Sequence, residues 1–307
     1  MRAGVAGTGH LGFHHARILR DLAEEVVVYD TDSKRQAEVS AELEVQAASG
    51  LEELLERVDA LVVACTTSAH HGVVMKALQA GRHVLVEKPI AASVEQAREM
   101  VRAAADGDLT LAVGHVERFN PAVVAAEPLI ADPLFVEAHR LAPFGPRGTD
   151  VSVVMDLMIH DLDMVLSFAR SGVREVHASG VSVLSHEVDI ASARLLLETG
   201  AVVNLTASRI SREPMRKLRF FQRDSYVSID FADRTVEALR LGDGSIVPVP
   251  VHVQEHDALT AELSDFLSAC RGGRPAVPGE EGLRALEVAD RVIEAVREGQ
   301  RLIGSGD

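Results

Sequence analysis

Three side chains suited to proton transfer and charge stabilisation lie in two short segments of the sequence. Asp156 and His160 are four residues apart, and Asp163 follows three further on, so a helix places all three on one face. An imidazole with a carboxylate one turn away suits proton transfer near neutral pH, because the acid orients the ring and raises its basicity. In Glu87-Lys88-Pro89, the lysine offers a positive charge that could polarise a hydroxyl or carbonyl group, and the adjacent carboxylate keeps it charged. Taken alone, these segments also fit an ordinary polar helix face and a surface turn, so the elements around them decide between the two interpretations.

A glycine-rich turn near the start of the chain indicates a cofactor. Gly7-Thr8-Gly9-His10-Leu11-Gly12 matches G-x-G-x-x-G, follows an expected strand, opens an amphipathic helix and precedes a second strand that ends in Asp30. The glycines allow a tight turn and the close approach of a pyrophosphate, and the acid can bond a ribose diol. A carboxylate there repels a 2′-phosphate, so NAD is favoured over NADP, although Lys34 and Arg35 follow closely.

The first part of the chain, up to about residue 115, alternates short apolar runs with longer helical stretches. This alternation is typical of βαβ units and a parallel sheet, and continuous apolar runs suit strands that helices cover on both faces. We therefore expect an α/β fold with a doubly wound Rossmann sheet. Its expected strands are residues 3–6, 26–29, 60–64, 84–86 and 109–113. Lys88 follows the fourth of these strands, at the edge of the sheet where such folds bind ligands.

The rest of the chain has the period-2 alternation of strands with one covered and one solvated face. It predicts an α+β domain with a mostly antiparallel open sheet, in which Thr199-Gly200 turns a hairpin. The expected strands are 134–141, 173–184, 190–197, 202–210, 217–222 and 226–231, and the expected helices are 121–130, 151–169, 258–270 and 282–298. We divide the chain into a cofactor domain at 1–120 and a substrate and oligomerisation domain at 121–307, whose last helix could pack back on the first domain.

Composition excludes several classes of protein. With 47% hydrophobic and 25% charged residues, the 307-residue chain is typical of a folded globular protein. A net charge of −15 argues against nucleic-acid and membrane-surface partners. No run approaches the roughly 18 apolar residues of a membrane span, and no signal peptide is evident, so we expect a cytoplasmic protein. The two cysteines and the adjacent histidine pairs lack the spacing of a metal site, so no metal is expected.

The combination of these motifs resembles the glucose-fructose oxidoreductase / inositol dehydrogenase family (Gfo/Idh/MocA). The resemblance spans nearly the full length and depends on the glycine turn, on residues 77–89 with their Glu87-Lys88-Pro89 end, and on the Asp156/His160 helix. Residues 262–267 and 273–275 also resemble the closing helices of the family. The resemblance implies a dehydrogenase that oxidises a secondary hydroxyl of a sugar or sugar nucleotide and passes the hydride to NAD.

The family's functional residues carry over onto matching positions of this chain. Lys88, Asp156 and His160 become the catalytic residues: His160 takes the hydroxyl proton, Lys88 stabilises the developing alkoxide and Asp156 holds the imidazole. The Lys88-Pro89 peptide is expected to be cis. The residues implied in cofactor binding are Gly7, Thr8, Gly9, His10, Leu11, Gly12, Asp30, Thr66, Thr67, His70, Glu87 and Lys88. The family commonly pairs its second-domain sheets, so a homo-oligomer is expected.

A narrower resemblance concerns residues 113–121 and 147–160, which are similar to the branch that includes UDP-N-acetylglucosamine 3-dehydrogenases. It implies that Arg140 or Arg147 pairs with a diphosphate, since guanidinium binds phosphate bidentately, and that Asn120 bonds the sugar. The expected substrate-binding residues are Arg118, Asn120, Arg140, Arg147 and His160. Two alternatives stay open: a dehydrogenase of a free polyol such as an inositol or of an aldose, and a non-catalytic NAD-binding sensor of sugars.

Overall fold

Two units make up the computed structural model, which describes residues 1–145 and 151–304. The first unit combines residues 1–116 with 257–283, and the second combines 117–256 with the chain from residue 284 on. The chain therefore enters the first unit twice, where the sequence suggested one boundary near residue 120. The returning segment carries helix α8 (Ala258–Ala269) and the start of helix α9 (Gly279–Gly304).

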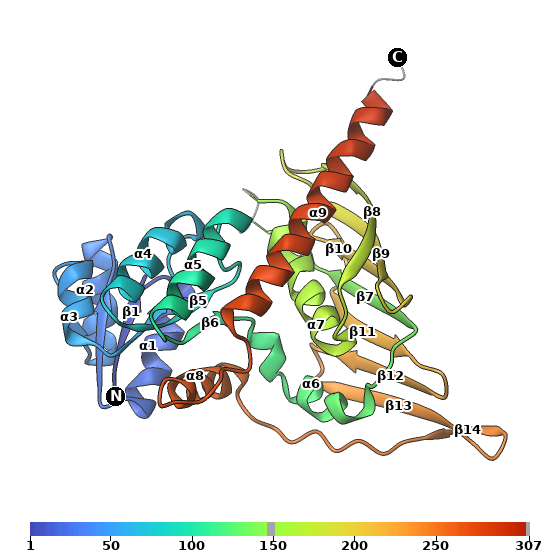
Figure 1. Ribbon diagram of the computed structural model, residues 1–307, viewed down its shortest axis with the longest axis horizontal. Coiled ribbons are helices and arrows are strands. Elements are labelled where there is room, and N and C mark those ends of the chain that lie inside the picture. Colours follow the sequence, from blue (N-terminus) through green and yellow to red (C-terminus); the bar gives the residue numbers. More distant parts are fainter. Residues whose placement is uncertain (146–150, 305–307) are drawn as a thin grey trace. The chain divides into compact units, whose positions relative to one another are not determined.

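The first unit is built on a parallel sheet of six strands in the order β3-β2-β1-β4-β5-β6 (Figure 1). The order reverses direction between β1 and β4, which gives the sheet the switch point of a doubly wound fold. The strands are β1 (Arg2–Ala6), β2 (Glu25–Tyr29), β3 (Gln46–Ala47), β4 (Ala60–Val63), β5 (His83–Glu87) and β6 (Leu111–Gly114). The helices between them are α1 (His10–Leu22), α2 (Ser33–Leu43), α3 (Leu51–Arg57), α4 (Thr67–Gln79) and α5 (Val94–Asp106).

Burial of the strands confirms the predicted parallel sheet. Val5, Val27 and Val86 at the strand centres are fully buried, as strands with helices on both faces require. Each pairing in this sheet is parallel, so the carboxyl ends of β1, β4 and β5 lie at one edge. That edge positions the turns after these strands, which hold the predicted cofactor residues.

The second unit contains a sheet of eight strands in the order β14-β13-β12-β11-β7-β10-β9-β8. All pairings are antiparallel except that of β7 with β10, so the mostly antiparallel sheet is confirmed. Gly200 has the positive φ of the predicted hairpin turn between β9 and β10. The strands are β7 (Phe135–Leu141), β8 (Val173–Val181), β9 (Ile190–Leu197), β10 (Val202–Ser208), β11 (Met215–Phe221), β12 (Ser225–Asp230), β13 (Thr235–Gly242) and β14 (Ser245–Pro248).

The last two strands, β13 and β14, were not expected. Most of their side chains are partly or fully exposed, so the alternation of buried and exposed residues that marks a strand is weak there. The Asp243-Gly244 pair between them has positive φ at both residues, which is the hairpin turn that such a dipeptide favours. The Asp243-Gly244 dipeptide is the feature of the sequence from which this hairpin could have been predicted.

Helices cover one face of this sheet. Val165 of helix α7 (Ile159–Ala169) and Val292 of α9 are fully buried in the same core as Val136 and Phe220 of the sheet. Residues Val154–Met158, before α7, form a π-helix where a continuous helix over 151–169 was expected. The remaining helical segments are α6 (Pro121–Ala126) and the 3₁₀ turns η1 (Val116–Phe119) and η2 (Glu127–Leu129).

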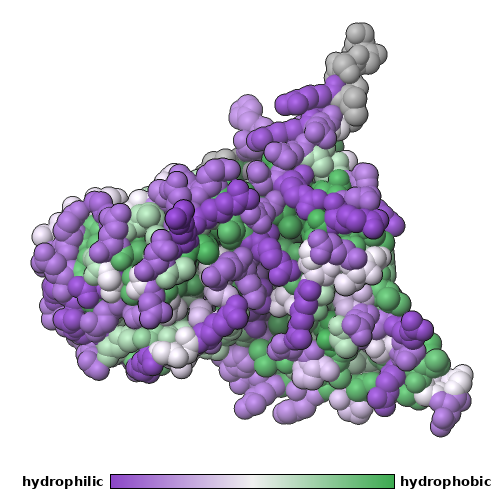
Figure 2. Space-filling model, viewed as in Figure 1, coloured by the Kyte–Doolittle hydropathy of each residue, from purple (hydrophilic) through white to green (hydrophobic). Residues whose placement is uncertain are grey.

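The surface differs between the helices and the sheet. Figure 2 shows mostly hydrophilic side chains over the helices of the first unit and hydrophobic ones along the right-hand margin, where strands of the second unit lie. Leu241 and Ile246 of the last hairpin are among the exposed hydrophobic residues. Among the described residues, no helix is both long enough and apolar enough to cross a membrane.

Candidate active site

The glycine turn after β1 is held by close backbone contacts. Gly7 has φ +97°, and a Cβ there would lie 2.6 Å from the carbonyl oxygen of Ala64. A Cβ at Gly12 would lie 1.8 Å from the carbonyl oxygen of Gly7, so only glycine fits at that position. Gly9 precedes the first turn of α1, and a Cβ there would meet nothing within 4 Å. The turn therefore offers open backbone and the N-terminus of α1, which together suit a pyrophosphate.

Asp30, just past the end of β2, lies beside this turn. Its carboxylate accepts hydrogen bonds from the backbone N–H of Thr8 (2.5 Å), from the Thr8 hydroxyl (3.0 Å) and from the backbone N–H of Asp32 (2.9 Å). Burial acts to raise the pKa of Asp30, but these hydrogen bonds outweigh it and lower the pKa. The carboxylate is therefore ionised at neutral pH and half-buried, as the acceptor of a ribose diol must be. Arg35 donates from Nε to the carbonyl oxygen of Thr8 (3.0 Å).

The Lys88 turn follows β5 at the same edge of the sheet. Its Lys88-Pro89 peptide is cis, as the resemblance implied. The buried His70 ring lies between the carbonyl oxygen of Pro89 (Nδ1, 3.0 Å) and that of Cys65 (Nε2, 3.2 Å). Burial lowers the pKa of His70, and a neutral ring can donate to only one of these two carbonyl oxygens. Contact between His70 and a cofactor stays a prediction.

The other predicted residues near β4 and in the glycine turn differ in exposure. Thr66 is exposed immediately before α4, Thr67 is the half-buried first residue of that helix, and His10 and Leu11 are exposed at the start of α1. All four are open to an approaching ligand. Burial raises the pKa of the Cys65 thiol, which disfavours the reactive thiolate.

Glu87 has two buried neighbours that the sequence analysis did not identify. His15 Nε2 lies 2.7 Å from Glu87 Oε1, and His15 is fully buried on α1. Glu262 of α8 is also buried, and one side-chain atom from each of the three residues lies within 4.8 Å of the others. The only sequence signal was the adjacent His14-His15 pair, which has no recognisable ligand spacing.

In the second unit, Asp156 lies on the π-helical turn and His160 in the first turn of α7, and both are half-buried. The sequence predicted that Asp163 shares a polar face with these two residues, but its side chain is buried. Asp163 is 1% exposed. Its carboxylate accepts hydrogen bonds from Arg118 Nε (2.7 Å) and from one terminal nitrogen of the same guanidinium (2.8 Å). Arg118 also donates to the Ser167 hydroxyl (2.6 Å). Asp163 is therefore a structural partner of Arg118.

Arg140 is engaged in a second buried network on β7. Its Nε and one terminal nitrogen donate to the Asp161 carboxylate at 2.9–3.1 Å, and its other terminal nitrogen donates to Glu117 at 3.1 Å. Burial acts to lower the pKa of Arg140, but the charges of Asp161 and Glu117 outweigh it and raise the pKa, so the guanidinium stays charged. The two arginine pairs hold Asp161 and Asp163, one and three residues after His160, and both contact α7.

Three of the predicted substrate residues make hydrogen bonds within the protein: Arg118, Asn120 and Arg140. Arg140 is 3% exposed with every guanidinium nitrogen bonded internally. Asn120 caps α6 through the backbone N–H of Ala122 (3.1 Å) and donates to the carbonyl oxygen of Phe231 (3.3 Å). The geometry therefore favours positioning roles for Arg118, Asn120 and Arg140 over direct contact with a substrate. Arg147 lies outside the described residues.

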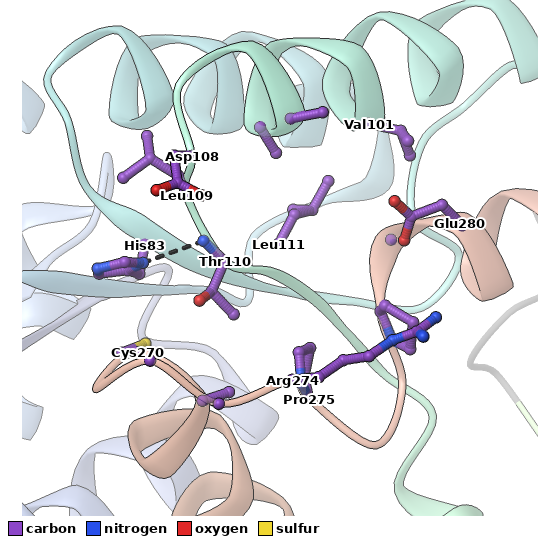
Figure 3. Close-up of a pocket in the computed structure, with 17 residues that line it drawn as sticks. His83, Val101, Asp108, Leu109, Thr110, Leu111, Cys270, Arg274, Pro275 and Glu280 are labelled. Atoms are coloured by element: carbon purple, nitrogen blue, oxygen red, sulfur yellow. Dashed lines mark hydrogen bonds between the residues drawn. The ribbon is translucent and has the colours of Figure 1, made fainter.

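Figure 3 shows a pocket in the first unit. It has a volume of about 590 Å³ and is lined in part by His83, Thr110, Cys270, Arg274 and Glu280. His83 begins β5 and Thr110 precedes β6, so the pocket lies at the amino-terminal edge of the sheet, opposite the glycine turn. His83 Nδ1 accepts from the Thr110 N–H (3.0 Å), and none of the lining residues is a predicted site residue.

Comparison with known proteins places this geometry in a class. A model of an oxidoreductase family with an NAD-binding Rossmann fold matches residues 1–115, and a model of the GFO/IDH/MocA C-terminal domain matches residues 94–224. The chain belongs to this family of NAD-binding oxidoreductases, and several members that resemble it are named as dehydrogenases. The family resemblance drawn from the sequence is confirmed.

Among individual proteins, the chain is 40% identical to the UDP-N-acetylglucosamine 3-dehydrogenase of Acidithiobacillus ferrooxidans, over 96% of this chain and 97% of that protein. A solved structure of that enzyme matches with a TM-score of 0.91 at 39% identity, over 96% of this chain and 97% of that chain. Inositol 2-dehydrogenase 2 of Paenarthrobacter aurescens is 29% identical over 96% of each chain. The WlbA dehydrogenase of Bordetella pertussis, solved with NADH and UDP-GlcNAcA, shares the fold at a TM-score of 0.84 and 19% identity, over 97% of this chain and 96% of that one.

The Arg140 network predicts a large cost for its removal. Arg140→Ala leaves the Asp161 carboxylate buried without its cation, so we expect the free energy of unfolding to fall by about 3–5 kcal/mol. Arg194, exposed on β9, provides a matched control, and Arg194→Ala should change it by about 0.5 kcal/mol or less. Denaturant titration of both variants measures the difference. Equal stability of the two variants would contradict a structural role for Arg140.

Proposed function

We propose that this chain is an NAD-dependent dehydrogenase that oxidises the C3 hydroxyl of UDP-N-acetylglucosamine or of a closely related UDP-sugar. The single observation that carries the proposal is the 40% identity, over nearly the whole of both chains, to the Acidithiobacillus ferrooxidans enzyme of that name. The Lys88 turn and the Asp156/His160 helix agree with a reaction that needs a cation and a base. An inositol is the second candidate, because inositol 2-dehydrogenases match at lower identity.

The glycine turn and Asp30 would hold the cofactor. The open backbone at Gly9 and the N-terminus of α1 suit the pyrophosphate, and the ionised Asp30 suits a ribose with a free 2′-hydroxyl. Bound NAD supplies the acceptor for the hydride. A 2′-phosphate beside Asp30 would meet a negative charge, so we propose NAD as the cofactor in preference to NADP.

The chemical roles follow from the side chains. His160 takes the proton of the substrate hydroxyl, and Asp156 orients the imidazole and stabilises its charged form. Lys88 stabilises the negative charge that develops on the oxygen. The buried pairs of Arg118 and Arg140 support this chemistry by fixing the helix that carries His160. Arg147 stays a predicted diphosphate contact on the sequence alone.

One experiment separates the candidate substrates. Purified protein with NAD is offered UDP-N-acetylglucosamine, myo-inositol and glucose in parallel, with a ketone trap, because formation of a 3-ketone can be thermodynamically uphill. We expect NADH formation, read by its near-ultraviolet absorbance, from the UDP-sugar. His160→Ala should lower the rate by about 10²–10⁴-fold, while His177→Ala, an exposed histidine on β8, should leave it unchanged.

Three outcomes contradict parts of the proposal. Turnover of myo-inositol in place of the UDP-sugar would make the chain a polyol dehydrogenase of the same family. Binding of NAD without turnover of any substrate would favour a non-catalytic sensor. The same reactions run with NADP should be slower, and equal rates with the two cofactors would contradict the role given to Asp30.

We also propose that the chain forms a homo-oligomer through the open face of its second-unit sheet. On that face, Phe221 contacts Phe135 and Tyr226, with ring centroids 5.5 and 5.1 Å apart, and Phe221 is 36% exposed. An exposed aromatic group on a sheet face suits burial against a second copy.

Light scattering tests this proposal through the molar mass. We expect a multiple of the 33.0 kDa chain mass, and a decrease towards one chain in Phe221→Glu because a buried charge opposes association. Val124→Glu, on the exposed side of α6, is the control and should keep the larger mass. A wild-type mass of a single chain would contradict the proposal.

A further inference from the structure

A buried group of one histidine and two glutamates lies directly behind the turn of the proposed catalytic lysine. His15 of α1, Glu87 at the end of β5 and Glu262 of α8 are 0%, 8% and 2% exposed. One side-chain atom from each lies within 4.8 Å of the other two. All three residues belong to the first unit. Carboxyl groups are seldom buried this far without a partner, so the charge state of the group needs an explanation.

Both oxygens of Glu87 take part in hydrogen bonds. Oε1 lies 2.7 Å from His15 Nε2, and Oε2 accepts from the backbone N–H of Lys88 at 3.3 Å. The Glu87 carboxyl group is thus held by one contact with a buried ring and one with the backbone. Gly114 on β6 fits closely against the same carboxyl group, since a Cβ there would lie 3.1 Å from Glu87 Cδ and Oε2. Glu87 is therefore fixed from three sides.

Glu262 differs from Glu87 in its hydrogen bonds. Neither of its carboxyl oxygens has a hydrogen-bond partner among the described residues. An ionised Glu262 would place a negative charge in a buried space beside the Glu87 carboxyl group, with no donor among the described residues to stabilise it. Burial, followed by the charges of Glu87 and Asp265, holds the pKa of Glu262 well above its ordinary value. The burial and the missing donors therefore favour an uncharged Glu262.

We propose that Glu262 is a positioning residue: as an uncharged carboxylic acid it packs against Glu87, keeps that carboxylate directed at His15, and so fixes the turn from which Lys88 extends. The catalytic role of Lys88 is part of the proposed function, and the positioning role rests on it. A divalent cation held by the same three residues is the competing explanation. It would replace the 2.7 Å hydrogen bond between His15 Nε2 and Glu87 with a bond from each of these atoms to the metal, and the experiments below distinguish the two explanations.

Two uncharged variants of Glu262 separate the effect of its polar atoms from that of its volume. Glu262→Gln keeps the size and the uncharged donor and acceptor, so we expect kcat and the affinity for NADH to stay near wild type. Glu262→Leu keeps much of the volume but has no polar atom to contact Glu87. We expect it to lower kcat by about 10–100-fold, because small displacements of a catalytic group have effects of that size, and to weaken NADH binding measured by fluorescence. Thermal melts confirm that both variants are folded.

An infrared measurement tests the uncharged state without any turnover. In D₂O at neutral pH, the wild-type spectrum minus that of Glu262→Gln should show the C=O stretch of an un-ionised carboxyl group. Absence of this band overturns the proposal, as does Glu262→Leu with wild-type kcat and NADH affinity. Metal analysis that finds one bound ion per wild-type chain, absent from Glu262→Gln, also overturns it in favour of the cation site.

Failure of the proposed function would be recognised separately. If the wild-type chain oxidises none of the offered sugars, the proposed substrate is wrong. The infrared band and the NADH affinities of the two variants still decide the state of Glu262 and its effect on the Lys88 turn. Loss of NADH affinity in Glu262→Leu together with its retention in Glu262→Gln supports the proposal in that case.

Discussion

The buried ion pair between Arg140 and Asp161 is the contact on which the geometry of the second unit depends. It joins the central strand β7 to helix α7, and Glu117 completes it. The Arg118–Asp163 pair fixes the same helix two residues further along. A charge buried without its partner costs several kcal/mol, so the two pairs together permit essentially one placement of α7. His160 directly precedes the two anchored acids on α7, so its position depends on residues that need not touch a substrate.

In the first unit, close packing of the backbone fixes where helix α1 begins. Gly12 leaves no room for a Cβ against the carbonyl oxygen of Gly7, so α1 begins where the turn after β1 directs it. His15, one turn later on the same helix, then meets Glu87 at the end of β5. The same short helix thus provides the open N-terminus that suits a pyrophosphate and a hydrogen-bond partner of the acid beside Lys88. Substitution in the glycine turn is expected to affect both.

Features set by local pattern could be predicted from the sequence, whereas pairings between distant residues could not. The parallel strands, the glycine turn and Asp30 follow from runs of apolar residues and from a motif within 30 residues. The partners of Arg118 and Glu87 are 45 and 72 residues away in the chain, and no spacing rule connects them. Arg118 and Arg140 were therefore interpreted as substrate residues because their buried acidic partners were not visible. The π-helical turn at Asp156 was missed for a related reason, since the apolar pattern of residues 151–169 fits a continuous helix.

Transfer of an isotopic label tests the central claim, that this chain moves a hydride from a sugar carbon to NAD. UDP-N-acetylglucosamine with deuterium at C3 is incubated with the protein, NAD and a ketone trap, and the reduced nicotinamide is examined by mass spectrometry. We expect NADH one mass unit heavier than the product from unlabelled sugar, with the deuterium at C4 of the nicotinamide. NADH formed without deuterium would show that another carbon is oxidised, and no NADH from either sugar would contradict the assignment of a UDP-sugar dehydrogenase.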